Sequence, residues 1–223
     1  MSNDPTDRTA LLAGATGLVG CAVLTRLLAS PRYRKVVVLV RRPLGAMAPK
    51  LEQQVVDFGR IEAHSLAVAV DDVFCCLGTT IKVAGSRAAF RRVDHDYPVA
   101  LARMAAANGA QRFAMISSLG ADPGSSVFYS RVKGETEADV AALALPHYWF
   151  LRPSLLAGQR AETRVGERIG LAVAGLIGPL MIGAMRRYRA IHADTVAAAM
   201  LALVSSDRPS GPVESDELAR LGR

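Results

Sequence analysis

A doubly wound parallel α/β sheet is the fold that this sequence predicts, and three observations support the prediction. Short apolar runs of strand length alternate with segments whose apolar residues recur at helical spacing. Strands separated by helices imply parallel βαβ units with right-handed crossovers. Of the 223 residues, 51% are hydrophobic, which is enough for one domain with a sizeable core.

The first half of the chain contributes four strands and one helix. Residues 9–15 predict the first strand, and residues 17–30 carry apolar side chains at helical spacing. Three more strands are expected at residues 35–40, 53–58 and 71–78, and the first of these is rich in β-branched residues.

The second half contributes two more strands and three helical segments. They are expected over residues 86–109, 112–118, 129–145, 147–154 and 192–207. The first helical segment ends at Gly109, a residue suited to a helix C-terminus. Pro98 predicts a bend or a restart inside that segment. Asp194 is placed to cap the last helix.

One domain is expected to span residues 1–223, with residues about 154–192 forming a short C-terminal substrate lobe or lid. Residues 170–185 in this lobe are apolar and uncharged. A membrane-spanning helix needs about 20 residues, and this stretch is shorter and contains four glycines and Pro179. A buried helix or pocket lid is therefore favoured over a membrane segment.

The charge pattern favours a small anionic ligand over nucleic acid. The formal net charge is +7. The arginines are scattered, with short clusters at residues 41–42, 91–92 and 186–189, and no basic stripe alternates with aromatic residues.

The cysteines and histidines show no metal-ligand spacing, so no metal site is expected. They are Cys21, Cys75, Cys76, His64, His95, His147 and His192. Cys75 and Cys76 would point to opposite faces of a strand. Because the thiols are expected to be reduced and the chain opens with a polar stretch, a cytoplasmic protein is predicted.

A glycine turn follows the first predicted strand and enters the first helix. Gly14, Gly17 and Gly20 would allow a tight turn, a close approach to a pyrophosphate and close packing of the helix on the sheet. The alternative is a tightly packed turn without a ligand. The residues expected to contact the cofactor here are Gly14, Ala15, Thr16, Gly17, Leu18 and Val19.

The end of the second strand favours NADP(H). Arg41 and Arg42 stand where NAD-binding proteins carry an acidic residue, and guanidinium groups can bind a 2′-phosphate. The alternative is a pair of exposed loop arginines. Further cofactor contacts are expected where the third and fourth strands end, at Asp57, Phe58, Leu77, Gly78 and Thr79.

A tyrosine and a lysine supply a candidate catalytic pair. Tyr129 and Lys133 are four residues apart, so they share a helix face. A free tyrosine has a pKa of about 10, and a neighbouring ammonium stabilises the phenolate. Tyr129 could thus exchange a proton with a carbonyl or alcohol oxygen, which Ser117 or Ser118 would hold. Lys133 could also hold the nicotinamide ribose. The alternative is an ordinary surface pair.

Four motifs, GATGLVG, FCCLGTT, ISSLGAD and YSRVK, together resemble the short-chain dehydrogenase/reductase superfamily. The run from Phe74 to Glu137, with LRPSLL at residues 151–156, looks like the atypical branch that includes the Tat-interactive oxidoreductase-like proteins and their bacterial relatives. This resemblance covers nearly the whole chain. It implies a Rossmann-like fold, NADP(H) binding and a Ser-Tyr-Lys site. It also implies that Pro153, Ser154 and Leu155 lie near the nicotinamide, and it favours Ser118 over Ser117.

The predicted function is an NADP(H)-dependent oxidoreductase acting on a small carbonyl or alcohol substrate. Two alternatives stay open. One is an NADPH-binding regulator that gates a protein partner with little turnover. The other is an enzyme like the nucleoside-diphosphate-sugar epimerases, against which Arg41 and Arg42 argue. No oligomeric state is predicted.

Overall fold

The computed structural model describes residues 7–45, 47–64, 66, 68–157 and 187–223. These residues form a seven-stranded parallel sheet with the order β3-β2-β1-β4-β5-β6-β9. Its strands are β1 (Arg8–Ala13), β2 (Tyr33–Val40), β3 (Leu51–Val55), β4 (Asp72–Cys75), β5 (Arg112–Ile116), β6 (His147–Arg152) and β9 (Gly211–Glu214). The predicted doubly wound α/β fold is confirmed.

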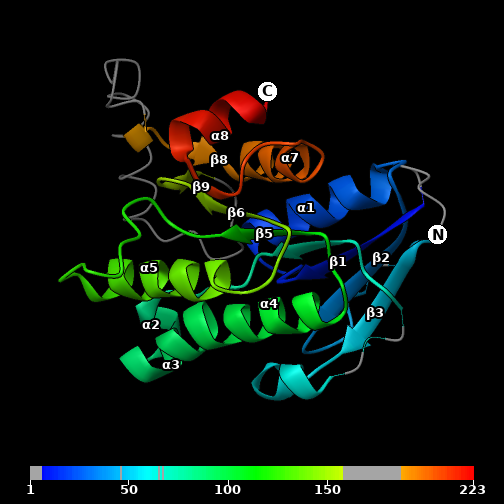
Figure 1. The fold of residues 1–223 in the computed structure, drawn as a ribbon, viewed down its shortest axis with the longest axis horizontal. Helices are drawn as coiled ribbons and strands as arrows, with labels where there is room; N and C mark the ends of the chain where they lie inside the picture. Colours follow the sequence, from blue (N-terminus) through cyan, green and yellow to red (C-terminus); the bar gives the residue numbers. More distant parts are fainter. Residues whose placement is uncertain (1–6, 46, 65, 67, 158–186) are drawn as a thin grey trace.

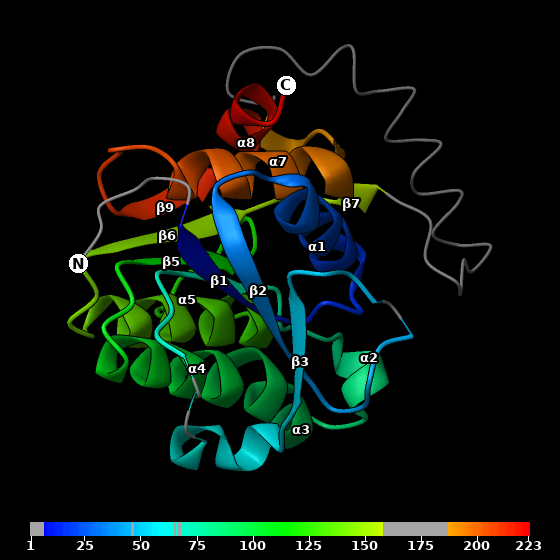
Figure 2. The same cartoon turned by 90° about the vertical axis from the view of Figure 1, so that its right-hand side faces the viewer.

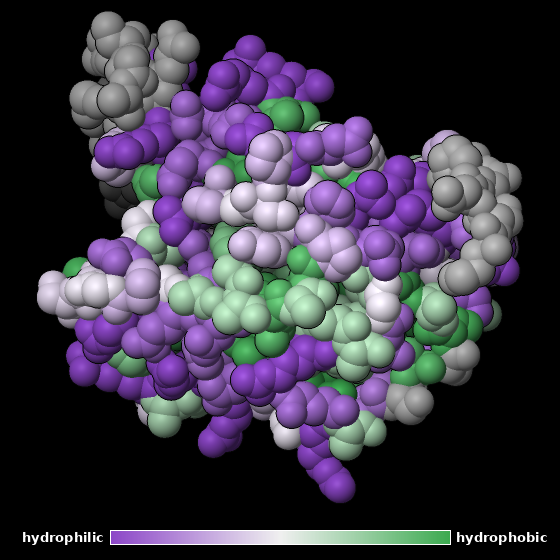
Figure 3. Space-filling view, viewed as in Figure 1, coloured by the Kyte–Doolittle hydropathy of each residue, from purple (hydrophilic) through white to green (hydrophobic). Residues whose placement is uncertain are grey.

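Helices cover both faces of the sheet (Figures 1 and 2). Figure 1 shows α1 (Leu18–Ala29), α7 (Ala193–Val204) and α8 (Ser215–Leu221) above the strands. Below them lie α4 (Tyr97–Ala107) and α5 (Phe128–Ala141), with the 3₁₀ segment η1 (Phe58–Ala63) beside α4. The surface in Figure 3 is hydrophilic at the level of α8, and more hydrophobic residues form a band at the level of α4 and α5.

The central strands are buried on both faces, and successive side chains enter different cores. Leu12 and Val38 pack in the core under α1 and α7, whereas Leu11 and Val37 pack in the core under α4. This alternation is the period of two expected for a strand. Cys75 lies in the second core and Cys76 packs against the first, so the predicted opposite orientation of the two thiols is confirmed.

The long helical region over residues 86–109 is divided into three parts. They are α3 (Arg87–Arg91), a π-helical turn η2 (Arg92–Asp96) and α4. Pro98 lies at the start of α4, directly after the π-helical turn, and the backbone at Arg92, Asp96 and Tyr97 is already right-handed helical. Because proline has no N–H group, it cannot donate a hydrogen bond to the preceding turn, and the irregular turn accompanies this loss. The irregularity predicted at Pro98 is present as a π-helical turn inside a continuous helical path, without a break between α3 and α4. Gly109, with φ of +75°, follows the C-cap and ends the helix as predicted.

The predicted N-cap at Asp194 is wrong. His192 is the N-cap of α7, and Asp194 lies exposed in the first helical turn. The cause is tertiary pairing: Ile191–His192 forms the short strand β8 beside β7 (Leu156–Ala157), which keeps the chain extended as far as His192. The Asp194 carboxylate there still favours the helix dipole.

The edge strand β9 and helix α8 were not predicted. β9 contains a glycine and Pro212, which weaken the strand pattern. At a sheet edge a proline is tolerated, because one side of the strand has no partner. Val213 is buried, and Arg152 Nη1 lies 3.1 Å from Glu214 Oε1, so packing and an ion pair hold β9 against β6.

No helix among the described residues is long and apolar enough to cross a membrane. The lid or buried helix predicted for residues 170–185 lies outside the described residues. Most of the lobe predicted for residues about 154–192 does so as well.

Candidate active site

The glycine turn is packed tightly against the end of β4. Gly14 has φ of +89°, and a Cβ atom on it would lie 2.4 Å from the carbonyl oxygen of Cys76. A Cβ atom on Gly20 would lie 2.0 Å from the carbonyl oxygen of Gly14. The turn between β1 and α1 therefore requires glycine at both positions.

The start of α1 has the properties of an anion-binding site. Its N-cap, Gly17, has no side chain to bond the first N–H groups, and its first turn contains no acidic residue. Thr16 and Gly17 are exposed. Unpaired N–H groups and the positive end of the helix dipole attract anions such as a pyrophosphate. The donor set of this chain thus fits a dinucleotide.

The other predicted adenosine contacts also lie where strands end. Arg41 and Arg42 are exposed directly after β2. The Asp57 side chain caps η1 by accepting a hydrogen bond from the Gly59 N–H group, at 2.9 Å. The Phe58 ring is buried, with its centroid 5.8 Å from that of Tyr97.

The loop after β4 brings Leu77, Gly78 and Thr79 next to a buried carboxylate. The Thr79 N–H group donates a hydrogen bond to Asp94 Oδ2 at 2.8 Å. A Cβ atom on Gly78 would lie 3.3 Å from Asp94 Oδ1 and 3.8 Å from Lys133 Nζ. Gly78 therefore gives this loop its close approach to the lysine of the candidate pair.

Tyr129 and Lys133 both lie on α5, as predicted. The Tyr129 ring is half-buried against Phe90, with 5.5 Å between centroids. Lys133 is buried, and its Nζ atom lies 2.7 Å from Asp94 Oδ1. Burial alone would lower the pKa of Lys133, but Asp94, and after it Tyr129, raise it above its ordinary value. The structure thus contains a buried, charged lysine four residues from a tyrosine.

The two serines after β5 have different surroundings. Ser117 is buried and donates its hydroxyl hydrogen bond to Glu137. Arg152 binds the same carboxylate, with 3.0 Å between Arg152 Nε and Glu137 Oε1. Ser118 is half-buried and its hydroxyl lies 3.3 Å from the Leu119 carbonyl oxygen, at the long end of hydrogen bonding.

The segment after β6 is held by local hydrogen bonds. The carbonyl oxygen of buried Pro153 accepts from the Leu119 N–H group at 3.0 Å. The Ser154 N–H group donates to Ser215 Oγ at 3.2 Å, and the Ser154 hydroxyl donates to the Arg189 carbonyl oxygen. Leu155 is 51% exposed. Ser154 is thus engaged within the protein, whereas the Leu155 side chain reaches solvent.

A protein-family model described as NAD(P)H-binding matches residues 14–207. This protein is an atypical short-chain dehydrogenase/reductase. Protein HTATIP2 from Rattus norvegicus is 38% identical over 165 residues, which cover 72% of this chain and 68% of the relative. Protein FMP52, mitochondrial, from Eremothecium gossypii is 33% identical over 219 residues, covering 95% and 96% of the two chains.

Solved structures of the same architecture include enzymes that act on nucleotide sugars. UDP-glucose 4-epimerase from Thermotoga maritima has a TM-score of 0.66 and 18% identity, and the match covers 96% of this chain and 81% of that one. MoeE5 in complex with UDP-glucose and NAD has a TM-score of 0.66 and 19% identity, with coverage of 96% and 80%. At this identity the likeness shows the Rossmann-like fold alone.

The predicted cytoplasmic location is contradicted by the relatives. Several fungal relatives are named as mitochondrial proteins; they come from Eremothecium gossypii, Aspergillus fumigatus, Aspergillus clavatus and Emericella nidulans. The prediction depended on reduced cysteines, and these distinguish reducing from oxidising surroundings without separating one reducing compartment from another.

Two residues of this short-chain dehydrogenase/reductase site were missed in the sequence. Glu137 lies four residues after Lys133 and eight after Tyr129, so counting along the helix face could have found it. Asp94 sits among charged residues in the stretch RRVDHD, which resembles a solvated helix face. Its burial depends on the π-helical turn, for which the stretch carries no signal beyond the following Pro98.

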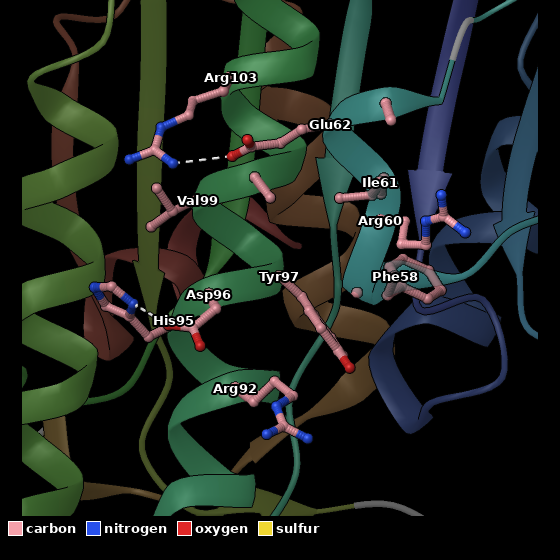
Figure 4. Close-up of a pocket in the computed structure, with 13 residues that line it drawn as sticks. Phe58, Arg60, Ile61, Glu62, Arg92, His95, Asp96, Tyr97, Val99 and Arg103 are labelled. Carbon is pink, nitrogen blue, oxygen red and sulfur yellow. Dashed lines mark hydrogen bonds and ion pairs between the residues drawn. The ribbon is translucent and has the colours of Figure 1, made fainter.

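A separate groove of about 570 Å³ lies between η1 and α4 (Figure 4). The ion pair between Arg103 and Glu62, at 2.9 Å, connects its two sides. His95 also lines this groove, and its ring nitrogens lie 2.8 Å from Asp96 Oδ1 and 2.9 Å from Asp139 Oδ2. Of the predicted site residues, Phe58 alone belongs to its lining among the described residues. The groove is therefore distinct from the Tyr129–Lys133 pair.

Proposed function

We propose that this protein is an NADP(H)-dependent oxidoreductase that interconverts a small carbonyl compound and its alcohol. The observation that carries the proposal is the buried, charged Lys133 on the same helix face as Tyr129. The anion-binding start of α1 and the loop after β4, which contacts Asp94 beside Lys133, supply the second support. Together they join a dinucleotide-binding turn to a group able to transfer a proton.

The preference for NADP(H) over NAD(H) is inferred from Arg41 and Arg42. Both are exposed at the end of β2, so their guanidinium groups are available to an incoming phosphate. A 2′-phosphate would gain charge-assisted hydrogen bonds there, which contribute about 1.5–3 kcal/mol each. A carboxylate at the same place would repel the phosphate.

When bound, the nicotinamide supplies or accepts the hydride. In the reducing direction, Tyr129 would donate its phenolic proton to the carbonyl oxygen of the substrate. The Lys133 ammonium would stabilise the phenolate that remains. In the oxidising direction, the same phenolate would accept the hydroxyl proton of the alcohol.

Ser118 is the serine that we assign to the substrate oxygen. The hydroxyl of Ser117 is engaged by Glu137, which Arg152 also binds. Among the described residues, the Ser118 hydroxyl has only a long contact, with the Leu119 carbonyl oxygen. Its hydroxyl can therefore turn to donate a hydrogen bond to the substrate oxygen with little loss.

The test of this proposal is a screen of carbonyl compounds, followed at the nicotinamide absorbance, with wild-type protein and the Tyr129→Phe variant. Tyr129→Phe keeps the ring but removes the proton, so NADPH binding should survive while turnover falls by about 10²–10⁴. Tyr148→Phe, near the start of strand β6, makes the same chemical change and should keep the wild-type rate.

A Tyr129→Phe variant with wild-type turnover would rule out this mechanism. NADPH binding without turnover of any carbonyl or alcohol would favour the regulatory alternative. Turnover of a nucleotide sugar with tightly retained NAD would favour the epimerase alternative.

A further inference from the structure

A buried ion pair joins α5 to the irregular turn before α4. The side chains of Lys133 and Asp94 are 6% and 1% exposed, with 2.7 Å between Nζ and Oδ1. The second carboxylate oxygen of Asp94 accepts the hydrogen bond from the Thr79 N–H group at 2.8 Å. Asp94 thus connects the lysine of the candidate pair to the loop that follows β4.

The backbone around Asp94 is held in place from α5. Asp94 lies in the π-helical turn η2, a rare conformation that is frequent at functional sites. The Thr136 hydroxyl, one turn beyond Lys133 on α5, lies 2.7 Å from the Val132 carbonyl oxygen and 3.0 Å from the Asp94 carbonyl oxygen, so its one proton is shared between the two acceptors. Both the main chain and the side chain of Asp94 are therefore fixed relative to the helix that carries Tyr129 and Lys133.

Among the described residues, three ionisable groups from three elements interact with the Lys133 ammonium: Asp94 from η2, Tyr129 from α5 itself, and Cys75 from β4. The Cys75 thiol stays neutral, because burial raises its pKa to about 12. Within the part of the chain that the structure describes, Asp94 is therefore the carboxylate that opposes the effect of burial on the ammonium. Without it, the surroundings of Lys133 would favour the neutral amine, which cannot stabilise a phenolate.

We propose that Asp94 is a positioning residue for the Tyr129–Lys133 pair: its buried carboxylate holds Lys133 as an ammonium beside Tyr129 and fixes that ammonium to the loop after β4. Asp94 acts only through Lys133 and touches no reacting atom. The inference rests on the proposed function, since it gives the ion pair its role in proton transfer.

The direct test is the titration of Lys133 by NMR in protein labelled at the lysine ε-carbons. The chain has four lysines, and the Lys133→Met variant assigns the signal. Asp94→Asn should shift the Lys133 titration to lower pH. Glu135→Gln, which removes a carboxylate from the same helix where it pairs with Arg91, should leave it unchanged. Equal Lys133 titrations in the two variants would overturn the proposal.

A double-mutant cycle covers the case in which Asp94→Asn is unstable. Asp94→Asn and Lys133→Met each leave one buried partner uncompensated, whereas the double variant removes both charges. The double variant should lose less free energy of unfolding than the sum of the two single losses. Additive losses, or a double variant that fails to fold while Glu135→Gln folds, would overturn the proposal.

A pH–rate profile separates positioning from a merely structural role. Turnover of Asp94→Asn in the reducing direction should fall at lower pH than in the wild type, and Asp94→Glu should restore part of the difference. A pH-independent loss of turnover would count against Asp94 as a positioning residue. The NMR titration needs neither substrate nor cofactor, so its result is separate from the success or failure of the proposed function.

Discussion

Ser117 donates its hydroxyl hydrogen bond to Glu137, and so one of two adjacent serines is engaged by a buried carboxylate. Arg152 holds that carboxylate from β6 and also pairs with Glu214 on β9. Glu137 therefore connects the end of β5 to two further strands. This arrangement is the basis for our proposal that Ser117 is structural and that Ser118 binds the substrate oxygen.

The serine assignment predicts opposite effects of two alanine variants. Ser117→Ala should lower the free energy of unfolding by about 1.5–3 kcal/mol, the usual contribution of a hydrogen bond to a charged group, with little change in turnover. Ser118→Ala should keep stability but lower kcat by about 10², the usual loss for one oxyanion donor. Thermal unfolding and steady-state kinetics measure the two effects, and the reverse pattern would move the catalytic role to Ser117.

The exposed arginines after β2 predict a cofactor preference. NADPH should bind at least about tenfold more tightly than NADH, since one charge-assisted contact contributes that much. The Arg41→Ala/Arg42→Ala variant should lose this preference in calorimetric titrations. The Arg26→Ala/Arg220→Ala variant removes the same charge from exposed positions on α1 and α8 and should keep it. Equal losses in both variants would indicate a general effect of net charge.

The packing of Gly20 predicts a loss of stability for Gly20→Ala. The added Cβ atom would meet the Gly14 carbonyl oxygen at 2.0 Å, and this backbone atom cannot move without opening the turn. We expect a loss of about 1–3 kcal/mol or more in the free energy of unfolding, with weaker cofactor binding. Gly45→Ala meets no atom within 4 Å and serves as the control. A Gly20→Ala variant as stable as Gly45→Ala would contradict the close packing.

Cys75 predicts a loss of stability in alkaline solution. Burial raises the pKa of the Cys75 thiol from 9.0 to about 12. Between these pH values the thiol keeps its proton in the folded protein but loses it in the unfolded chain, so rising pH favours unfolding. The contribution of the buried Cys75 thiol to the free energy of unfolding is fully present below pH 9 and is lost as the pH rises toward 12. Denaturant unfolding between pH 8 and 10.5 should therefore show a shallower decline for Cys75→Ala than for wild type. The exposed Cys21→Ala variant should decline as the wild type does.

The fold was predictable because local patterns and burial agree along most of the chain. The apolar run at residues 36–40, mostly β-branched, is buried on both faces of the sheet, and such a run has few alternatives to a central strand. β9 was not predicted, because Gly211 and Pro212 disfavour a strand locally. The segment is extended because it pairs with β6 at the edge of the sheet. The predicted N-cap at Asp194 was wrong because of tertiary pairing as well: β7 pairs with His192 and keeps it extended, so the helix begins at Ala193.

By itself, the sequence determined the glycine turn, the two arginines after β2 and the spacing of Tyr129 and Lys133. These features depend on the order of residues within one turn or one helix, where covalent geometry fixes the outcome. Only the tertiary structure decided that Ser117 meets Glu137 and that Lys133 meets Asp94, which are 20 and 39 positions apart in the chain. Such contacts arise when packing brings distant segments together and burial forces each polar group to find a partner.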